Sequence, residues 1–290
     1  MANETLTSAF SDIADAIRAK GVTGTMTPLQ MPTKIADIPS GSGTRYGVSG
    51  ESILGPVDVN GALQEPNTPF IFSSTEIVSI PVSGLPDKFK KNKALVSVNL
   101  PNLTTVNSYG LASAFQDCTS LSSVNLSSLS DIRDSGLSNA FKGCTSLISI
   151  SIPNITSLSR GYELNATFQG CTSLQTVDLS NLSSVSGSQS SQFNNCFMGC
   201  TGLKKAYLTK FSSQLPNTYQ NLFNGCTSLE LVDFSQSASV PPMSYNMFAN
   251  TNSTFQIVVP DALYETWIAT SGWSNFSAQI VKASEYVPAP

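Results

Sequence analysis

The chain contains 290 residues, of which 40% are hydrophobic and only 12% are charged, about half the charged share of an average protein. Its net charge of −4 argues against a nucleic-acid-binding surface. The chain contains no histidine, which excludes histidine-ligated metals and a histidine catalytic base. No apolar stretch approaches the roughly 20 residues that span a bilayer, and the N-terminus lacks the basic and apolar regions of a signal peptide. We therefore expect a chain without a membrane partner, made in the cytoplasm, whose six cysteines are thiols.

Residues 1–40 are predicted to form a helical attachment module. The segment Glu4–Lys20 has the pattern of an amphipathic helix, because its apolar residues recur at intervals of four, three and four. Those residues, the candidates for attachment or oligomerisation, are Leu6, Phe10, Ile13 and Ile17. Their apolar face packs either on Leu29–Ile38 of the same chain or on neighbouring copies and a partner protein. Two heptads are too few for an independent coiled coil, so a partner would have to supplement the contact.

Residues 41–71 are predicted to be a linker followed by a short β connector. Ser40–Gly43 has the composition of a flexible linker. The segment Tyr46–Leu63 is predicted to hold short strands joined by turns, because Asn60 and Gly61 form a hairpin-type turn pair.

Residues 72–258 are repetitive. Seven phenylalanines recur at intervals of 25 to 29 residues, and five of them precede a cysteine by three residues, which in turn precedes a leucine by three. The phenylalanines are Phe89, Phe115, Phe141, Phe168, Phe197, Phe223 and Phe248. A period in this range is typical of a solenoid or an array, and we expect about seven repeats of about 26 residues.

Each repeat contains a run of the form Leu-x-x-Val-x-Leu, which has the period of a β-strand, as in Leu95–Leu100. Its first, fourth and sixth residues are predicted to point inward, and its third and fifth residues outward. Parallel stacking of seven such strands gives a sheet roughly 30 Å long. Each phenylalanine follows a turn of helical spacing, as in Leu111–Phe115, and is predicted to stack on its copies along the opposite wall. The predicted fold class is an α/β repeat solenoid that needs a cap at each end.

The unit Phe-x-Gly-Cys-Thr-Ser-Leu followed by Val-x-Leu resembles the BspA-like leucine-rich repeat of bacterial surface proteins. The resemblance implies a leucine-rich-repeat solenoid whose parallel sheet lies on the concave face. It also implies a helical C-terminal cap over residues 259–290. A helix over Asp261–Thr270 would cover the last repeat with Leu263 and Trp267.

Five of the six cysteines are placed by the repeat, and none belongs to a Cys-x-x-Cys pair. Cys196 and Cys200 have the spacing of a zinc half-site, but Cys196 occupies a position that Ala114 and Ala140 hold in other repeats. Cysteine side chains that point in parallel rarely meet the torsion of a disulfide. We therefore predict buried thiols that pack in the core, no metal site and no cofactor.

The third and fifth positions of the strand runs form an outward row on the predicted sheet. The row is small and neutral in its first half, whereas its second half carries charges and one aromatic ring. Such a row is suited to sugars through hydrogen bonds and ring stacking; the alternative is that these side chains only solvate the sheet. The candidate ligand-binding residues are Asn99, Asn125, Asp178, Lys205, Tyr207 and Asp233.

Asp178 and Asp233 are a candidate carboxylate pair for glycoside hydrolysis. They are expected to lie two strands apart, at about 10 Å by the spacing of strands in a sheet. That separation is just beyond the roughly 9.5 Å limit of an inverting glycosidase. Gly41 and Gly43 lack the context of a phosphate-binding loop. We therefore predict no catalytic residue and no enzymatic activity.

The N-terminal region carries a second resemblance. Residues 13–38 and 46–63 are similar to N-terminal segments of tail- and fibre-associated proteins of bacteriophages that infect Gram-positive gut bacteria. Both resemblances together imply a structural virion protein, made in the host cytoplasm and placed on a tail, baseplate or head fibre, whose solenoid serves adhesion or host recognition. The expected partners are other virion proteins at residues 1–40 and a bacterial surface glycan or protein on the solenoid, in a homo-oligomer for which a trimer is one candidate. The alternative is a bacterial cell-surface or secreted adhesin of the same repeat family.

Overall fold

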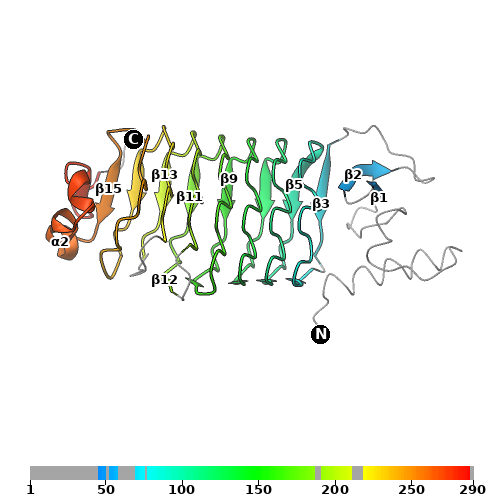
Figure 1. Ribbon diagram of the computed structural model, residues 1–290, viewed down its shortest axis with the longest axis horizontal. Coiled ribbons are helices and arrows are strands. Elements are labelled where there is room, and N and C mark those ends of the chain that lie inside the picture. Colours follow the sequence, from blue (N-terminus) through cyan, green and yellow to red (C-terminus); the bar gives the residue numbers. More distant parts are fainter. Residues whose placement is uncertain are drawn as a thin grey trace, which may run out of the picture.

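The computed structural model describes residues 45–49, 52–57, 69–75, 77–186, 191–210 and 218–287. From residue 69 onward, the repeats stack on one another in an elongated, nearly straight row (Figure 1). The predicted attachment module, with Leu6, Phe10, Ile13 and Ile17, lies outside the described residues, as do Ser40–Gly43 and the Asn60-Gly61 pair.

The described part of the connector is one antiparallel strand pair. Strand β1 (Arg45–Ser49) pairs with β2 (Ser52–Val57), and the register shifts between Gly47 and Val48. Short strands were predicted in this part of the chain, and these two agree with that prediction.

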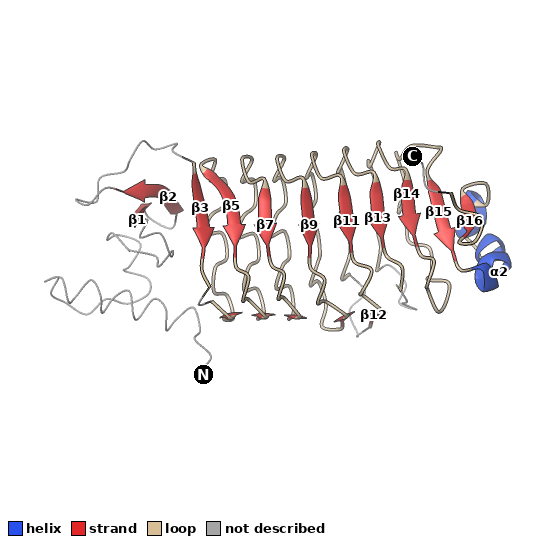
Figure 2. Cartoon of the chain, turned by 180° about the vertical axis from the view of Figure 1, so that it is seen from behind, coloured by secondary structure: helices blue, strands red, loops and turns tan. Residues whose placement is uncertain are grey.

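Each repeat contributes one strand to a parallel sheet along one side of the solenoid (Figure 2). The first part of this sheet contains β3 (Phe70–Ser73), β5 (Leu95–Asn99) and β7 (Ser123–Asn125). The second part contains β9 (Ser149–Ser151), β11 (Thr176–Asp178), β13 (Lys205–Tyr207), β14 (Leu231–Asp233), β15 (Gln256–Val259) and β16 (Ile280–Lys282). Because the row of strands is nearly straight, the expected concave curvature is not seen, and we call this surface the sheet face.

A second row, made of two-residue strands, runs along another edge of the solenoid. It contains β4 (Ser79–Ile80), β6 (Thr105–Val106) and β8 (Asp131–Ile132), and then β10 (Ser157–Leu158) paired with β12 (Ser184–Val185). Among the described strands, neither β7 with β9 nor β8 with β10 is paired, so both rows are interrupted between the same two repeats. The next step between phenylalanines, from Phe141 to Phe168, is one residue longer than the two steps before it, and its extra residue lies after β10.

The third side of the solenoid is a wall of successive turns. Backbone N–H groups alternate in direction: Ala112 donates to the carbonyl of Tyr109 in its own repeat at 3.2 Å, whereas Leu111 donates to Gly136 in the next repeat at 2.9 Å. Every fourth residue has a positive φ, which an α-helix does not contain. In this repeat those residues are Tyr109 at 55°, Ser113 at 54° and Asp117 at 59°. The prediction of a helical turn was therefore wrong, and the described repeats consist of strands and turns.

The seven repeated phenylalanines form one continuous stack in the core. Consecutive ring centroids lie 5.2 to 5.8 Å apart from Phe89 to Phe248. All seven side chains are buried. Phe72 of β3 extends the stack, with its ring centroid 4.8 Å from that of Phe89. The predicted phenylalanine spine is confirmed.

A cysteine ladder runs beside the phenylalanine stack. The Sγ of Cys118 donates a hydrogen bond to the carbonyl of Phe89 in the preceding repeat at 2.9 Å, and four further cysteines repeat this contact. Burial raises the pKa of Cys118, Cys171 and Cys226 to about 12. All six cysteines are free and buried, which confirms the prediction of core thiols.

The C-terminal end of the solenoid differs from the helical cap that was predicted. A 3-10 turn (η2, Asp261–Leu263) leads into one short helix, α2 (Tyr264–Ala269). A second 3-10 turn (η3, Trp273–Phe276) follows, and β16 then adds a strand to the sheet beside β15. Trp267 and Trp273 are fully buried, with ring centroids 4.5 Å apart. The end of the solenoid is therefore covered by two buried indoles, one short helix and a further strand.

Candidate binding surface

The outward row on the sheet face has the register that the repeats predict. Asp178 of β11 pairs with Tyr207 of β13, and Tyr207 pairs with Asp233 of β14. The residue before each of them, as in Ala206, points inward and is fully buried. Lys205 lies beside Thr176 in the neighbouring column. Four of the six candidate residues are thus brought together on three adjacent strands.

The other two candidates, Asn99 and Asn125, lie on the first part of the sheet and bond to each other. The Nδ2 of Asn125 donates to Oδ1 of Asn99 at 2.8 Å, and Nδ2 of Asn99 donates to the hydroxyl of Ser73 at 3.2 Å. The Oδ1 of Asn125 also accepts the N–H of Ser127 at 3.1 Å. These amides already link successive repeats, so they have less hydrogen-bonding capacity for a ligand than the charged half of the row.

The two aspartates of the row each use one oxygen to hold the turn that follows the strand. Oδ1 of Asp178 accepts the N–H of Ser180 at 2.9 Å, and Oδ1 of Asp233 accepts the N–H of Ser235 at 2.8 Å. This local bond orients both carboxylates along the edge of the sheet. An ionised carboxylate has further acceptor sites, so each remains able to accept hydrogen bonds from a ligand.

Two outward positions near this site are buried, although the alternation places them on the sheet face. Leu231 pairs with Lys205, and Val258 pairs with Asp233, yet both side chains are only 3% exposed. The chain after β16 returns to this area. Partial burial, and after it the neighbouring Tyr207 and Asp233, raise the pKa of the Tyr286 hydroxyl.

Tyr286 is the residue of this surface that sequence reasoning missed. It lies outside the repeats, and no periodic pattern connects it with Tyr207. Its backbone N–H donates to the carbonyl of Lys282 at 3.1 Å, which closes the turn after β16. The candidate surface therefore combines two tyrosines with Asp178, Asp233 and Lys205.

Ion pairs border this surface and are exposed. The Nζ of Lys204 lies 3.7 Å from Oε1 of Glu230, with about half of each side chain exposed. Exposed pairs of this kind contribute little to stability. They do present both signs of charge beside the tyrosines.

The structure offers Asp178 and Asp233 no buried environment for acid catalysis. Tyr207 stands on the strand between them, and Asp178 is exposed. Within the described residues, no group of three His, Cys, Asp or Glu side chains could hold a metal ion.

No helix in the described part of the chain has the length and apolar character to cross a membrane.

The chain matches the model of the BspA type leucine rich repeat region in six copies, over residues 85–196 and 138–266. Among curated proteins, none matches the chain. A leucine rich repeat protein of T. pallidum, a solved structure, is similar at 19% identity and a TM-score of 0.43, over 79% of this chain and 93% of that one.

Two further solved structures are similar at lower scores. TLR13 in its complex with ssRNA13 is 15% identical with a TM-score of 0.22, over 68% of this chain and 36% of that one. A leucine-rich repeat protein of Bacteroides ovatus is 14% identical with a TM-score of 0.19, over 75% of this chain and 77% of that one.

Proposed function

Because this chain belongs to the BspA-type leucine-rich repeat family, we propose that it is a non-enzymatic binding protein that recognises a surface ligand with the charged half of its sheet face. The observation that carries this proposal is the register that places Asp178, Tyr207 and Asp233 side by side on adjacent strands. One aromatic ring between two acceptors, with Lys205 in the next column, can bind a glycan or a polar protein surface through hydrogen bonds and ring contacts.

The rest of the described molecule provides a rigid support for that surface. The phenylalanine stack and the cysteine ladder join successive repeats, and the strands from β9 to β14 pair in an unshifted register. Rigid display limits the entropy that is lost on binding. Weak contacts of single copies become strong when several copies bind together.

We propose that the protein is located on a bacteriophage virion, where residues 1–40 form the anchor and the solenoid is displayed outward. The support is the similarity of residues 13–38 and 46–63 to tail- and fibre-associated proteins. The alternative is a bacterial surface adhesin, to which family membership applies equally. Mass spectrometry of purified virions tests the choice: detection of the chain in particles is expected, and its presence only on bacterial cells would contradict the virion proposal.

Deletion of residues 1–40 tests the anchor. The solenoid from residue 69 onward should keep its thermal unfolding transition, while incorporation into particles should be lost. Incorporation of the deleted chain at the level of the full chain would contradict the role of these residues.

The sheet-face proposal is tested with a double variant, Asp178→Ala with Tyr207→Ala. The matched control is Ser149→Ala with Ser151→Ala, which removes two exposed side chains from β9 on the same face. Binding of the labelled full chain to whole bacterial cells and to a glycan array should fall at least tenfold in the first variant and stay unchanged in the control. Equal binding of all three proteins would overturn the proposal.

A further inference from the structure

Two exposed tyrosines occupy equivalent positions in repeats that lie two apart. Tyr109 is 50% exposed and Tyr162 is 41% exposed. Tyr109 N–H donates to the carbonyl of Asp134 at 3.1 Å, which places Tyr109 beside Ser135. Ser135 N–H in turn donates to Gly161 at 3.0 Å, which places Ser135 beside Tyr162. The two rings therefore stand on one corner of the solenoid, on either side of a small serine, about 10 Å apart by the spacing of stacked strands.

The backbone at both tyrosines is left-handed, with φ of 55° at Tyr109 and 58° at Tyr162. This conformation is unfavourable for a bulky side chain and is better suited to glycine or asparagine. The equivalent positions in neighbouring repeats hold Ser83 and Ser135. Neither ring is part of the buried core. The left-handed backbone is shared by the equivalent residues Ser83 and Ser135, so the unusual feature of these two positions is the bulky tyrosine side chain.

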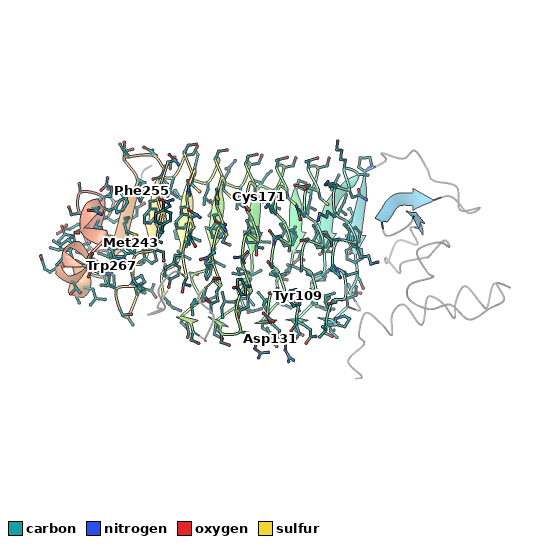
Figure 3. The ribbon with its side chains drawn as sticks, viewed as in Figure 1. Tyr109, Asp131, Cys171, Met243, Phe255 and Trp267 are labelled. Atoms are coloured by element: carbon teal, nitrogen blue, oxygen red, sulfur yellow. The ribbon has the colours of Figure 1, made fainter. Side chains whose placement is uncertain are left out.

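Charged side chains of both signs lie in the chain segments next to the two tyrosines. The Oδ2 of Asp131 lies 3.0 Å from Nε of Arg133, and its Oδ1 lies 3.8 Å from Nη2 of Arg160. Almost half of each arginine side chain is exposed. In Figure 3, Asp131 lies at the lower edge of the solenoid and Tyr109 lies above it, in the lower half of the view. With Asp134, the surface side chains of this corner carry two carboxylates and two guanidinium groups, so their charges balance.

A buried carboxylate holds the segment that carries Arg160 and Tyr162. Glu163 is fully buried, and its side chain accepts the N–H of Ser159 at 2.8 Å and of Gly161 at 2.9 Å. The N–H of Arg160 donates to the same carboxylate. This segment contains the extra residue of its repeat and follows β10, which pairs with β12 but not with β8. The repeat thus departs from its regular form, and its backbone is held in place by an interior side chain.

We propose that this corner is a second binding site, for an uncharged oligosaccharide. Tyrosine rings offer flat apolar faces to sugar rings, while Asp131 and the two arginines supply acceptors and donors for hydroxyl groups. The balanced charges of these surface side chains favour a neutral ligand over an acidic or a basic one. The exposed large apolar side chains here are the two rings and Val82, one repeat before Tyr109. This small apolar area suits a sugar chain better than the larger buried core of a protein interface.

The test uses the full chain with Tyr109→Asn and Tyr162→Asn combined, because asparagine tolerates the left-handed backbone. The matched control is Tyr245→Asn, which removes another tyrosine that is 69% exposed and whose φ is not positive. The probes are chitohexaose, cellohexaose and maltohexaose, and affinity is measured by titration calorimetry. We expect at least one probe to bind the unaltered chain and the control, and to bind the double variant at least tenfold more weakly.

Three results would overturn this proposal. The first is that none of the three hexasaccharides binds the unaltered chain, and the second is that the double variant and the control have equal affinity. The third is that the double variant loses binding only to a protein on bacterial cells, which protease treatment would reveal. The sheet-face variant Asp178→Ala with Tyr207→Ala should still bind the hexasaccharide, so failure of the corner site and failure of the sheet-face site are separate outcomes.

Discussion

The Sγ of Cys144 donates a hydrogen bond to the carbonyl oxygen of Phe115, 3.1 Å away in the preceding repeat. The same carbonyl accepts the N–H of Cys118 at 3.1 Å within its own repeat. One oxygen therefore closes a turn and joins two repeats at once. In the first repeat Asn92 takes the position of the cysteine, and its Oδ1 instead accepts the N–H groups of Ala94 and Leu95.

Replacement of Cys144 should show how much this contact contributes. We expect Cys144→Ala to lower the free energy of unfolding by about 1–2 kcal/mol, since it removes a buried side chain and one hydrogen bond. Urea denaturation followed by circular dichroism measures the change. Thr145→Ala, at the next and exposed position, serves as the control and should stay within about 0.5 kcal/mol of the unaltered chain.

The raised thiol pKa values predict a dependence of stability on pH. Burial raises the pKa of Cys118, Cys171 and Cys226 from 9.0 to about 12. Between about pH 9 and pH 12 the unfolded chain loses thiol protons that the folded chain keeps, so the free energy of unfolding should fall as the pH rises through this window. Denaturation at a series of pH values measures the slope. Serine at these three positions should flatten the slope, and an unchanged slope would contradict the assignment.

A substitution in the phenylalanine stack should destabilise the neighbouring repeats as well as its own. Phe141→Ala removes a buried ring whose centroid lies 5.3 Å from that of Phe115 and 5.7 Å from that of Phe168. We expect a loss of about 3–5 kcal/mol and a broader unfolding transition, because each repeat is stabilised only by its neighbours. Calorimetry and denaturant titration give both quantities. A single sharp transition with less than about 1 kcal/mol of loss would contradict a continuous core.

The buried carboxylate of Glu163 should stabilise the irregular repeat. Glu163→Gln keeps the size of the side chain but replaces one acceptor oxygen with a donor that faces backbone N–H groups. We expect a loss of about 1–3 kcal/mol, the cost of leaving a buried donor unpaired. Glu230→Gln, at an exposed ion pair, is the matched control and should cost at most about 1 kcal/mol. Equal effects of the two substitutions in denaturant titrations would contradict this role for Glu163.

The tyrosines at the corner should reduce stability. Tyr109→Asn relieves a bulky side chain in the left-handed region, so the variant should unfold at a higher temperature, by the equivalent of up to about 1 kcal/mol. Tyr245→Asn lacks this relief and should not gain stability. A lower melting temperature for Tyr109→Asn than for Tyr245→Asn would show that the ring at position 109 contributes to the fold.

Sequence periodicity predicted the strands and the core well, because both follow from spacing alone. The inward and outward positions of Asp178, Tyr207 and Asp233 follow from the alternation of side chains along a strand. The conformation of the turn wall did not follow, because Leu111–Phe115 has the spacing of a helix. The structure shows that its alternate N–H groups bond to the next repeat, and those distant carbonyls outweigh the local preference for a helical turn.

By itself the sequence determined the repeat length, the stacking of phenylalanines and cysteines, and the row of outward residues. All three need only that each repeat meets a near copy of itself, so the spacing in one repeat determines the contact with the next. The tertiary structure alone decided where the irregular parts lie. Tyr286 interacts with Tyr207 and Asp233 of the sheet face, and Arg160 lies 3.8 Å from Asp131 in a segment whose backbone Glu163 holds. Contacts of this kind join positions that no period relates, and only the folded chain brings them together.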